Sequence, residues 1–126
     1  MITVEGQTGR IVITVTAQRM GPDLNVSVFG GEAPHIGAVA LAQPRESLKR
    51  DGSASASCSV LTLCGHKEDE LARELALELA RLLGCNVCVA CGIHQDDILP
   101  EEIHGVLDVV EKLKIQALEL IRKANG

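Results

Sequence analysis

The chain has 126 residues, 46% of them hydrophobic, with a formal net charge of −5 and a single aromatic residue, Phe29. This length is typical of one domain, so we expect residues 1–126 to form a single domain around an aliphatic core. Because the 12 basic residues are scattered and almost no aromatic side chain accompanies them, the composition argues against nucleic-acid binding.

The chain shows no sign of a membrane or export segment. No stretch approaches the roughly 18 consecutive apolar residues of a membrane span, and the first residues lack the basic and apolar parts of a signal peptide. We therefore expect a soluble, cytoplasmic protein in a reducing compartment. The cysteines are then expected to be free thiols: Cys58, Cys64, Cys85, Cys88 and Cys91.

The first half of the chain reads as strands. Alternating apolar and polar residues predict one strand over 9–17 and another over 24–29, joined as a hairpin by the turn residues Gly21-Pro22-Asp23. An apolar run over 36–42, ended by Pro44, predicts a third strand, and residues 53–63 predict a fourth.

The second half alternates between helix and strand. Leucines at helical spacing, from Leu71 to Leu82, predict an amphipathic helix of about 17 residues that ends at Gly84. Residues 85–91 predict a fifth strand, and Pro100 opens a second helix, long enough for part of its apolar stripe to cover a partner subunit. The order β-β-β-β-α-β-α predicts an α+β (mixed α/β) fold, with one mixed sheet of about five to six strands and two helices packed on it.

Three short segments combine glycine with histidine: Pro34-His35-Ile36-Gly37, Gly65-His66-Lys67 and Gly92-Ile93-His94. The strands on either side of the first helix should run in parallel, which places the second and third segments on one sheet edge. An antiparallel third strand would begin at the same edge and bring His35 there. Ligands favour this edge in open α/β sheets, and a helix N-terminus beside Lys67 suits an anion. Arg45 is expected farther away, where it could act across a dimer interface.

Each of these residues also has a purely structural explanation. His66 is equally suited to capping a helix, His35 to packing beside Pro34, and His94 to a solvated loop. The alternating serines Ser53, Ser55, Ser57 and Ser59 share one face of a strand. That face is either an ordinary solvent-facing sheet surface or a polar wall beside a ligand or a hydrated subunit interface.

The cysteines Cys85, Cys88 and Cys91 have a spacing that resembles a metal signature. On a strand, however, Cys88 points away from the other two, so the three cannot surround one ion without breaking the strand. We therefore expect these cysteines in the core rather than at a metal. No nucleophile elbow, phosphate-binding Gly-rich loop or dinucleotide fingerprint occurs either, and we predict no catalytic residue.

Four stretches form a combined motif. They are Gly30-Gly31-x-x-Pro34-His35-Ile36-Gly37-Ala38-Val39-Ala40, Pro44-Arg45-x-Ser47, Ser57-x-Ser59-Val60-Leu61-Thr62-Leu63-x-Gly65-His66-Lys67-x-Asp69-Glu70 and Gly92-Ile93-His94-x-Asp96-x-Ile98. Together they resemble the small D-subunit family of gallate and hydroxyarylic acid decarboxylase systems, also described as prenylated-flavin chaperones. The resemblance covers roughly residues 30–120.

The resemblance implies a non-catalytic protein that binds prenylated FMN, the product of a flavin prenyltransferase. Such a protein stabilises the cofactor or delivers it to a decarboxylase apo-enzyme of the reversible aromatic-acid type. The matching positions, with two residues of the serine row added, give the candidate flavin-binding residues His35, Ile36, Gly37, Ala38, Arg45, Ser57, Ser59, Gly65, His66, Lys67, Gly92 and His94.

The residues themselves add two expectations to this resemblance. The helix N-terminus near His66 and Lys67 is suited to the FMN phosphate. The scarcity of aromatic residues favours a site at the interface of a homodimer. Two other functions remain open: a metal-dependent enzyme that uses His35, His66 and His94, and a structural decarboxylase subunit without a small ligand.

Overall fold

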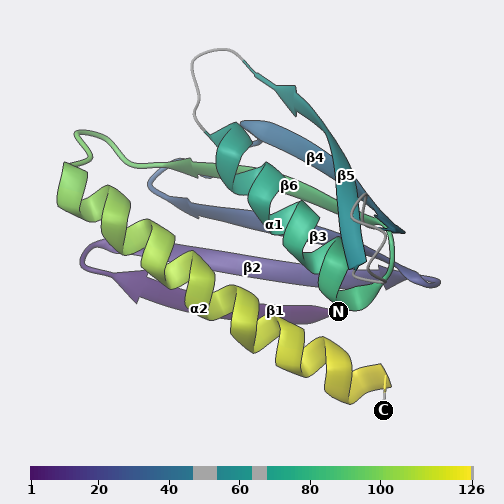
Figure 1. Cartoon of the computed structure of the whole chain (residues 1–126). Helices are drawn as coiled ribbons and strands as arrows, with labels where there is room; N and C mark the ends of the chain where they lie inside the picture. Colours follow the sequence, from purple (N-terminus) through teal and green to yellow (C-terminus); the bar gives the residue numbers. More distant parts are fainter. Residues whose placement is uncertain (47–53, 64–67, 126) are drawn as a thin grey trace.

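A computed structural model describes residues 1–46, 54–63 and 68–125 (Figure 1). These residues form β1 (Ile2–Thr8), β2 (Ile11–Met20), β3 (Asp23–Gly31), β4 (Ala38–Glu46), β5 (Ala54–Thr62), α1 (Glu68–Leu83), β6 (Val87–His94) and α2 (Pro100–Asn125). The predicted mixed sheet with two helices is confirmed. Strand β1 comes in addition, before the first predicted strand.

The six strands form one sheet in the order β1-β2-β3-β6-β4-β5. Only the central pair, β3 and β6, is parallel; all other neighbours are antiparallel. Strand β4 therefore lies between β5 and β6. The two strands that flank α1 run in the same direction, as predicted, but they are not hydrogen-bonded to each other.

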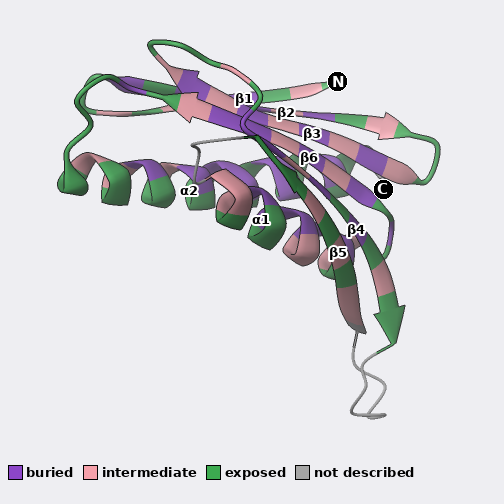
Figure 2. Ribbon diagram, turned by 90° about the horizontal axis from the view of Figure 1, so that it is seen from above, coloured by how far each residue is buried: buried purple, intermediate pink, exposed green. Residues whose placement is uncertain are grey.

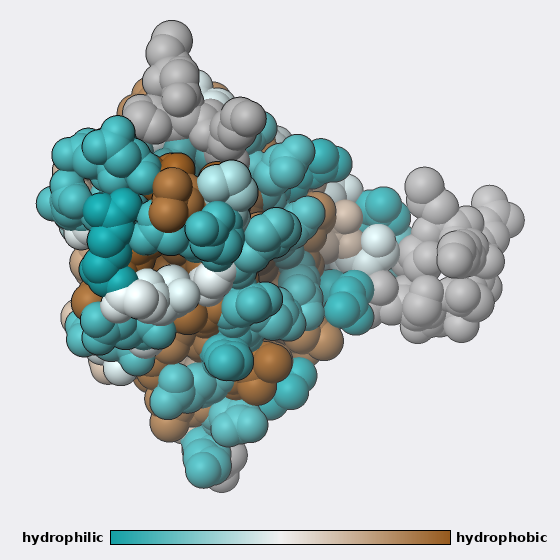
Figure 3. All heavy atoms as spheres, turned by 90° about the vertical axis from the view of Figure 1, so that its left-hand side faces the viewer, coloured by the Kyte–Doolittle hydropathy of each residue, from teal (hydrophilic) through white to brown (hydrophobic). Residues whose placement is uncertain are grey.

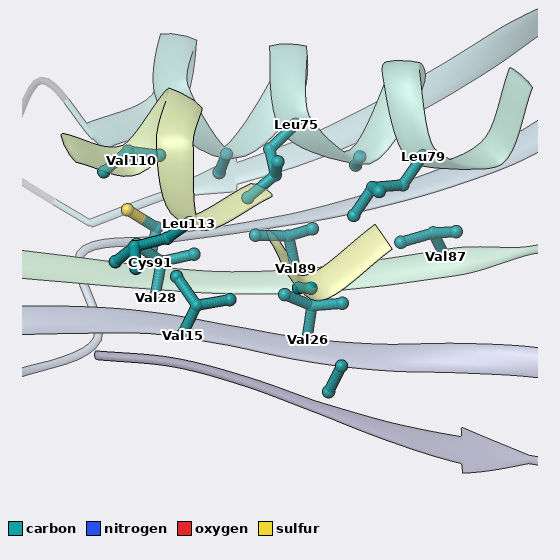
Figure 4. Close-up of a cluster of buried hydrophobic side chains, with 14 of the residues drawn as sticks. Val15, Val26, Val28, Leu75, Leu79, Val87, Val89, Cys91, Val110 and Leu113 are labelled. Carbon is teal, nitrogen blue, oxygen red and sulfur yellow. The ribbon is translucent and has the colours of Figure 1, made fainter. Parts of the chain in front are cut away.

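Both helices cover the same face of the sheet (Figure 2). Helix α1 packs on β4, β5 and β6, and α2 packs on β1 and β2. Figure 4 shows Leu75 and Leu79 of α1 above Val87 and Val89 of β6. Each such fully buried aliphatic side chain stabilises the fold by about 1.5–3 kcal/mol. The core is thus aliphatic, as expected, and it holds the sheet against the helices.

Helix α2 buries only part of its apolar stripe in the core. Val106, Val110 and Leu113 are in the core, whereas Leu107 is 47% exposed and Ile103 and Leu120 are also at the surface. These three side chains belong to the part of the stripe that the described chain leaves uncovered. Among the described residues, neither helix combines the length and the apolar composition that crossing a membrane requires.

Lys114 of α2 joins the two helices. Lys114 is only 5% exposed, and its ammonium lies 2.8 Å from a carboxylate oxygen of Glu78 of α1 and 2.7 Å from one of Glu111 of its own helix. Burial alone would lower the pKa of Lys114, but the hydrogen bonds to Glu111 and Glu78 outweigh it and raise that pKa. The lysine is therefore held as a cation between the helices.

Strand β4 does not stop at Pro44, as the sequence had suggested, but continues to Glu46. The last residue pair between β4 and β6 is Ala42 with Val87, and beyond it only β5 accompanies β4. Because only one side of the strand needs hydrogen bonds there, a proline is tolerated.

Candidate functional site

One edge of the sheet collects the ends of several strands. In the register, Gly31 of β3 lies beside His94 of β6, and Ala38 at the start of β4 lies between Cys91 of β6 and Thr62 of β5. Helix α1 begins close to the same edge, which is the left-hand end in Figure 1. The predicted convergence on one edge is therefore confirmed for the strands. We call this end of the sheet the histidine edge.

Two of the three predicted histidines meet there. The imidazole centroids of His35 and His94 lie 6.3 Å apart, with an interplanar angle of 77°. His35 Nδ1 lies 3.2 Å from the carbonyl oxygen of Ala33, and His94 Nε2 lies 2.9 Å from Asp96 Oδ1. A carbonyl oxygen only accepts hydrogen bonds, so Nδ1 of His35 carries a proton. The hydrogen bond from His94 is the main cause that lowers the pKa of Asp96.

Glu68, the first residue of α1, also belongs to this edge, although the sequence did not single it out as a site residue. Its carboxylate Oε1 lies 3.4 Å from His35 Nε2, and its side chain is only 11% exposed. The space for that carboxylate exists because Gly37 has no side chain: a Cβ there would come within 2.7 Å of Glu68 Oε2. Its place in the sequence, at the start of a helix that follows a Gly-His pair, is the signal that could have identified it.

The glycines of the edge pack backbone against backbone. The loop before β4 follows the end of β6, with Gly37 N–H donating to Cys91 O at 2.9 Å and His35 N–H to Gly92 O at 3.5 Å. A Cβ on Gly92 would overlap the His35 carbonyl oxygen. Gly37, Ala38 and Gly92 are all buried, and Ala38 is in the core. Their main contribution is thus to bring His35 and His94 together.

A hollow of about 280 Å³ opens beside His35, on the face of the sheet that carries no helix. Its lining combines the ring of Phe29 with Ile36, which is 58% exposed, and small residues of the central strands. Figure 3 looks onto the histidine edge, where hydrophilic residues surround small apolar areas. An aromatic ring, an aliphatic side chain and an imidazole around one hollow are typical of small-molecule sites.

A second network supports the loop that follows His94. Arg10, from the turn between β1 and β2, donates to the Asp96 carbonyl oxygen at 3.1 Å and to both carboxylate oxygens of Glu102 at 2.9 and 3.0 Å. Gln95, buried behind the edge, donates to Glu32 Oε1 at 2.5 Å. These contacts fix the chain from 95 to 99. None of them was predicted, because they join residues far apart in the sequence without a local pattern.

Arg45 lies away from the histidines, near the other end of β4, and Ser57 and Ser59 flank the middle of β5. Arg45 Nε donates to Ser57 Oγ at 2.8 Å. Ser57 and Ser59 line a larger hollow of about 620 Å³, together with Leu41 and Cys88. Both hollows open on the helix-free face, and Cys88 and Ala90 of β6, one in each, are two residues apart, or about 7 Å. Arg45 is therefore separated from the histidines, as the sequence predicted.

The remaining predicted positions, Gly65, His66 and Lys67, lie outside the described residues, as does Cys64. Among the described cysteines, Cys88 and Cys91 point to opposite faces of β6, as predicted. Cys91 is in the core, whereas the prediction of a core position was wrong for Cys88, which is half-buried and lines the larger hollow. Burial raises the pKa of Cys91 to about 12. Within the described ranges, no three His, Cys, Asp or Glu side chains gather as a possible metal site.

The fold and this edge define a small α+β protein with a ligand-sized hollow on an open sheet. Comparison with known families is specific: the model of the prenylated flavin chaperone LpdD-like domain matches residues 7–122. The chain belongs to this family of prenylated flavin chaperones. Among curated proteins, none matches the chain.

Among solved structures, the chain is similar to a subunit of a chaperone complex for yeast 20S proteasome assembly. The TM-score is 0.55 over 99% of this chain and 98% of that one, with 13% sequence identity. At this identity the likeness concerns the fold alone.

Proposed function

We propose that the protein is a non-catalytic, cytoplasmic binding protein for prenylated FMN. It holds the cofactor at the helix-free face of the sheet beside the histidine edge, and it stabilises the cofactor or passes it to a decarboxylase apo-enzyme of the reversible aromatic-acid type. The observation that carries this proposal is the meeting of His35 and His94 beside the hollow of Phe29 and Ile36, in a chain of the prenylated flavin chaperone family.

The hollows suit a flat, partly apolar ligand. Ligand sites typically measure about 300–1,000 Å³; the larger hollow, of about 620 Å³, lies in that range, and the adjoining hollow of about 280 Å³ is slightly below it. Phe29 offers a ring face for an isoalloxazine, and Ile36 offers an aliphatic surface for the prenyl-derived ring. Both ring nitrogens of His35 face protein partners, the Ala33 carbonyl oxygen and Glu68, so His35 contacts the flavin through the surface of its ring. When bound, prenylated FMN carries the chemistry that a decarboxylase uses; this chain only holds it.

The phosphate has two candidate anchors. The residues before α1, Gly65-His66-Lys67, combine a helix N-terminus with a cation, but three carboxylates follow at once: Glu68, Asp69 and Glu70. Arg45 beside Ser57 is the second anchor, and it can bind a phosphate oxygen through a charge-assisted hydrogen bond. We assign the phosphate to residues 65–67, because they immediately precede α1, and α1 begins close to the edge that carries the hollow with Phe29.

Loss of affinity in Lys67→Ala, with Arg45→Ala unchanged, supports this assignment. The reverse result moves the phosphate to Arg45 and leaves the flavin proposal intact.

The proposal is tested by co-expression with a flavin prenyltransferase, followed by an absorbance spectrum and mass analysis of the anaerobically purified protein. We expect one prenylated FMN for each chain. Protein that carries no flavin, together with a stoichiometric metal and a turnover lost in His94→Ala, would indicate the metal-dependent enzyme instead. Co-purification with a decarboxylase that survives His35→Ala and carries no flavin would indicate a structural subunit.

A further inference from the structure

The face of the sheet opposite the helices has an unusual composition. Residues that pair across neighbouring strands share a face, so one row across it reads Thr16, Ser27, Ala90, Val39 and Leu61. The next row reads Asn25, Cys88, Leu41 and Ser59. Leu61 is 76% exposed and Leu41 is 56% exposed. No described helix or strand covers these rows, because both helices lie on the other face of the sheet (Figure 2).

Charged side chains stand only at the margin of this face, as far as its residues are described. Glu5 is on the edge strand β1, Asp23 begins β3, and Arg45 is next to the last residue of β4. A sheet face that meets water normally carries interspersed charges, whereas the centre of a protein interface is depleted of them and has a polar rim. The distribution found here is that of an interface.

The helix-free face is also large enough to form a stable interface between two proteins. Six strands about 4.8 Å apart, with about eight residues each at about 3.3 Å, span roughly 24 by 26 Å. Two such faces would remove about 1,200 Å² from solvent, which reaches the lower limit of stable interfaces. Small, neutral side chains on both sides would pack without burying an unpaired charge, as sheets in a sandwich do.

We propose that a second copy of this chain docks on the helix-free face, sheet against sheet, as a two-fold symmetric dimer. Most soluble oligomers are homo-oligomers of this symmetry, in which one surface meets itself. The helix-free face suits such a dimer, because its centre carries no charge and can therefore pack against the same centre of a second copy.

The dimer would complete the flavin site, and this part of the inference rests on the proposed function. Ser27, Phe29 and Ala90 belong both to the docking face and to the hollow beside His35. A second copy would therefore roof the hollow and shield the cofactor from water and oxygen. It would also supply the second surface that a flavin needs in a chain with one aromatic residue.

The test is sedimentation of the full-length chain over micromolar concentrations, with and without reduced FMN. We expect a mass of about twice the 13.4 kDa of one chain. Leu41→Lys and Thr16→Lys should each weaken the dimer at least about 100-fold, because a lysine would be buried without a partner. Leu107→Lys is the matched control, since Leu107 is similarly exposed but lies on α2, and it should leave the dimer intact.

Circular dichroism shows whether each variant is folded. A monomeric wild type, or a dimer that tolerates both lysines on the sheet, overturns the inference; so does a dimer that only Leu107→Lys separates. The two proposals fail differently. A monomer that binds prenylated FMN would overturn the interface alone, and a dimer that binds no flavin would overturn the proposed function alone.

Discussion

His35 and His94 face each other edge to face, with ring centroids 6.3 Å apart, although one precedes β4 and the other ends β6. The backbone of the loop before β4 follows β6 closely enough to hydrogen-bond with it at Gly92 and Cys91. The histidine pair is therefore set by main-chain packing, and it stands beside the hollow that we assign to the flavin.

Replacement of His35 by alanine should weaken binding of reduced prenylated FMN up to about 10-fold. The expected loss corresponds to the contact between the imidazole ring and the flavin, about 0.5–1.5 kcal/mol. The measurement is an anaerobic titration followed by flavin absorbance. His104→Ala is the control, because His104 is exposed on α2, and it should bind as the wild type does. An equal loss of flavin affinity in His35→Ala and His104→Ala would show that His35 does not contact the flavin.

The ring of Phe29 is expected to matter as a ring and not only as apolar volume. Phe29→Leu keeps an apolar side chain but loses the stacking surface, worth about 0.5–1.5 kcal/mol, and should weaken flavin binding severalfold. Val12→Leu, on the neighbouring strand β2 and outside the hollow, serves as the control. The affinities come from the same anaerobic titration. Unchanged affinity in Phe29→Leu would place the isoalloxazine elsewhere.

Gly92→Ala should destabilise the fold by about 3 kcal/mol or more, because the new Cβ overlaps the His35 carbonyl oxygen and the loop has to move. Gly21→Ala is the matched control: its φ of +62° also disfavours a side chain, but nothing lies within 4 Å. It should cost only about 1 kcal/mol. Urea denaturation followed by circular dichroism measures both values. Similar costs for the two variants would contradict the close packing at the histidine edge.

The ion pair between Arg10 and Glu102 should give the protein a distinct acid sensitivity. The hydrogen bond from Arg10, with a smaller one from the Leu99 N–H, lowers the pKa of Glu102 from 4.5 to about 2. A carboxylate whose pKa is lower in the folded than in the unfolded protein stabilises the fold fully at pH values above its unfolded-state pKa. This stabilisation is lost as the pH falls through its folded-state pKa.

The Tm difference between wild type and Glu102→Gln should therefore be present above pH 4.5 and vanish near pH 2. Glu101→Gln, at an exposed neighbouring position, controls for the loss of one charge from the helix start. A difference that does not change with pH would show that Arg10 contributes nothing through this carboxylate.

Two substitutions of Lys114 separate the contribution of its charge from that of the aliphatic part of its side chain to the packing of the two helices. Lys114→Met keeps the apolar stem, and Glu78 and Glu111 can turn to solvent, so the unfolding free energy should change by less than about 1 kcal/mol. Lys114→Ala also loses the packing and should cost about 2 kcal/mol. The exposed Lys112→Ala is the control, and thermal unfolding gives all three values. A large loss in Lys114→Met would show that the ion pairs themselves are needed.

The geometry of the histidine edge could be predicted from the sequence because strand direction determines it. Two strands joined through α1 run the same way, so the residues after their ends share an edge, whichever strand is inserted between them. The insertion of β4 between β5 and β6 changed the neighbours but not that edge. His35 and His94 therefore met as expected.

The parts that could not be predicted depend on contacts between distant residues. The carboxylate of Glu68 fits only where Gly37 leaves space, and the loop after His94 is held by Arg10 from the turn between β1 and β2. Strand β1 was missed because Ile2 and Val4 alternate with polar residues only as far as Gly6. Its pairing with β2, and its cover by α2, supply the stability that the local pattern did not indicate.

The most direct test of the account is an anaerobic titration of the wild-type protein with reduced prenylated FMN and, separately, with reduced FMN. We expect saturable binding of one prenylated flavin for each chain, with a lower affinity for FMN, which lacks the prenyl-derived ring that we propose to contact Ile36. If neither flavin binds, the protein is not a flavin chaperone of the kind proposed here.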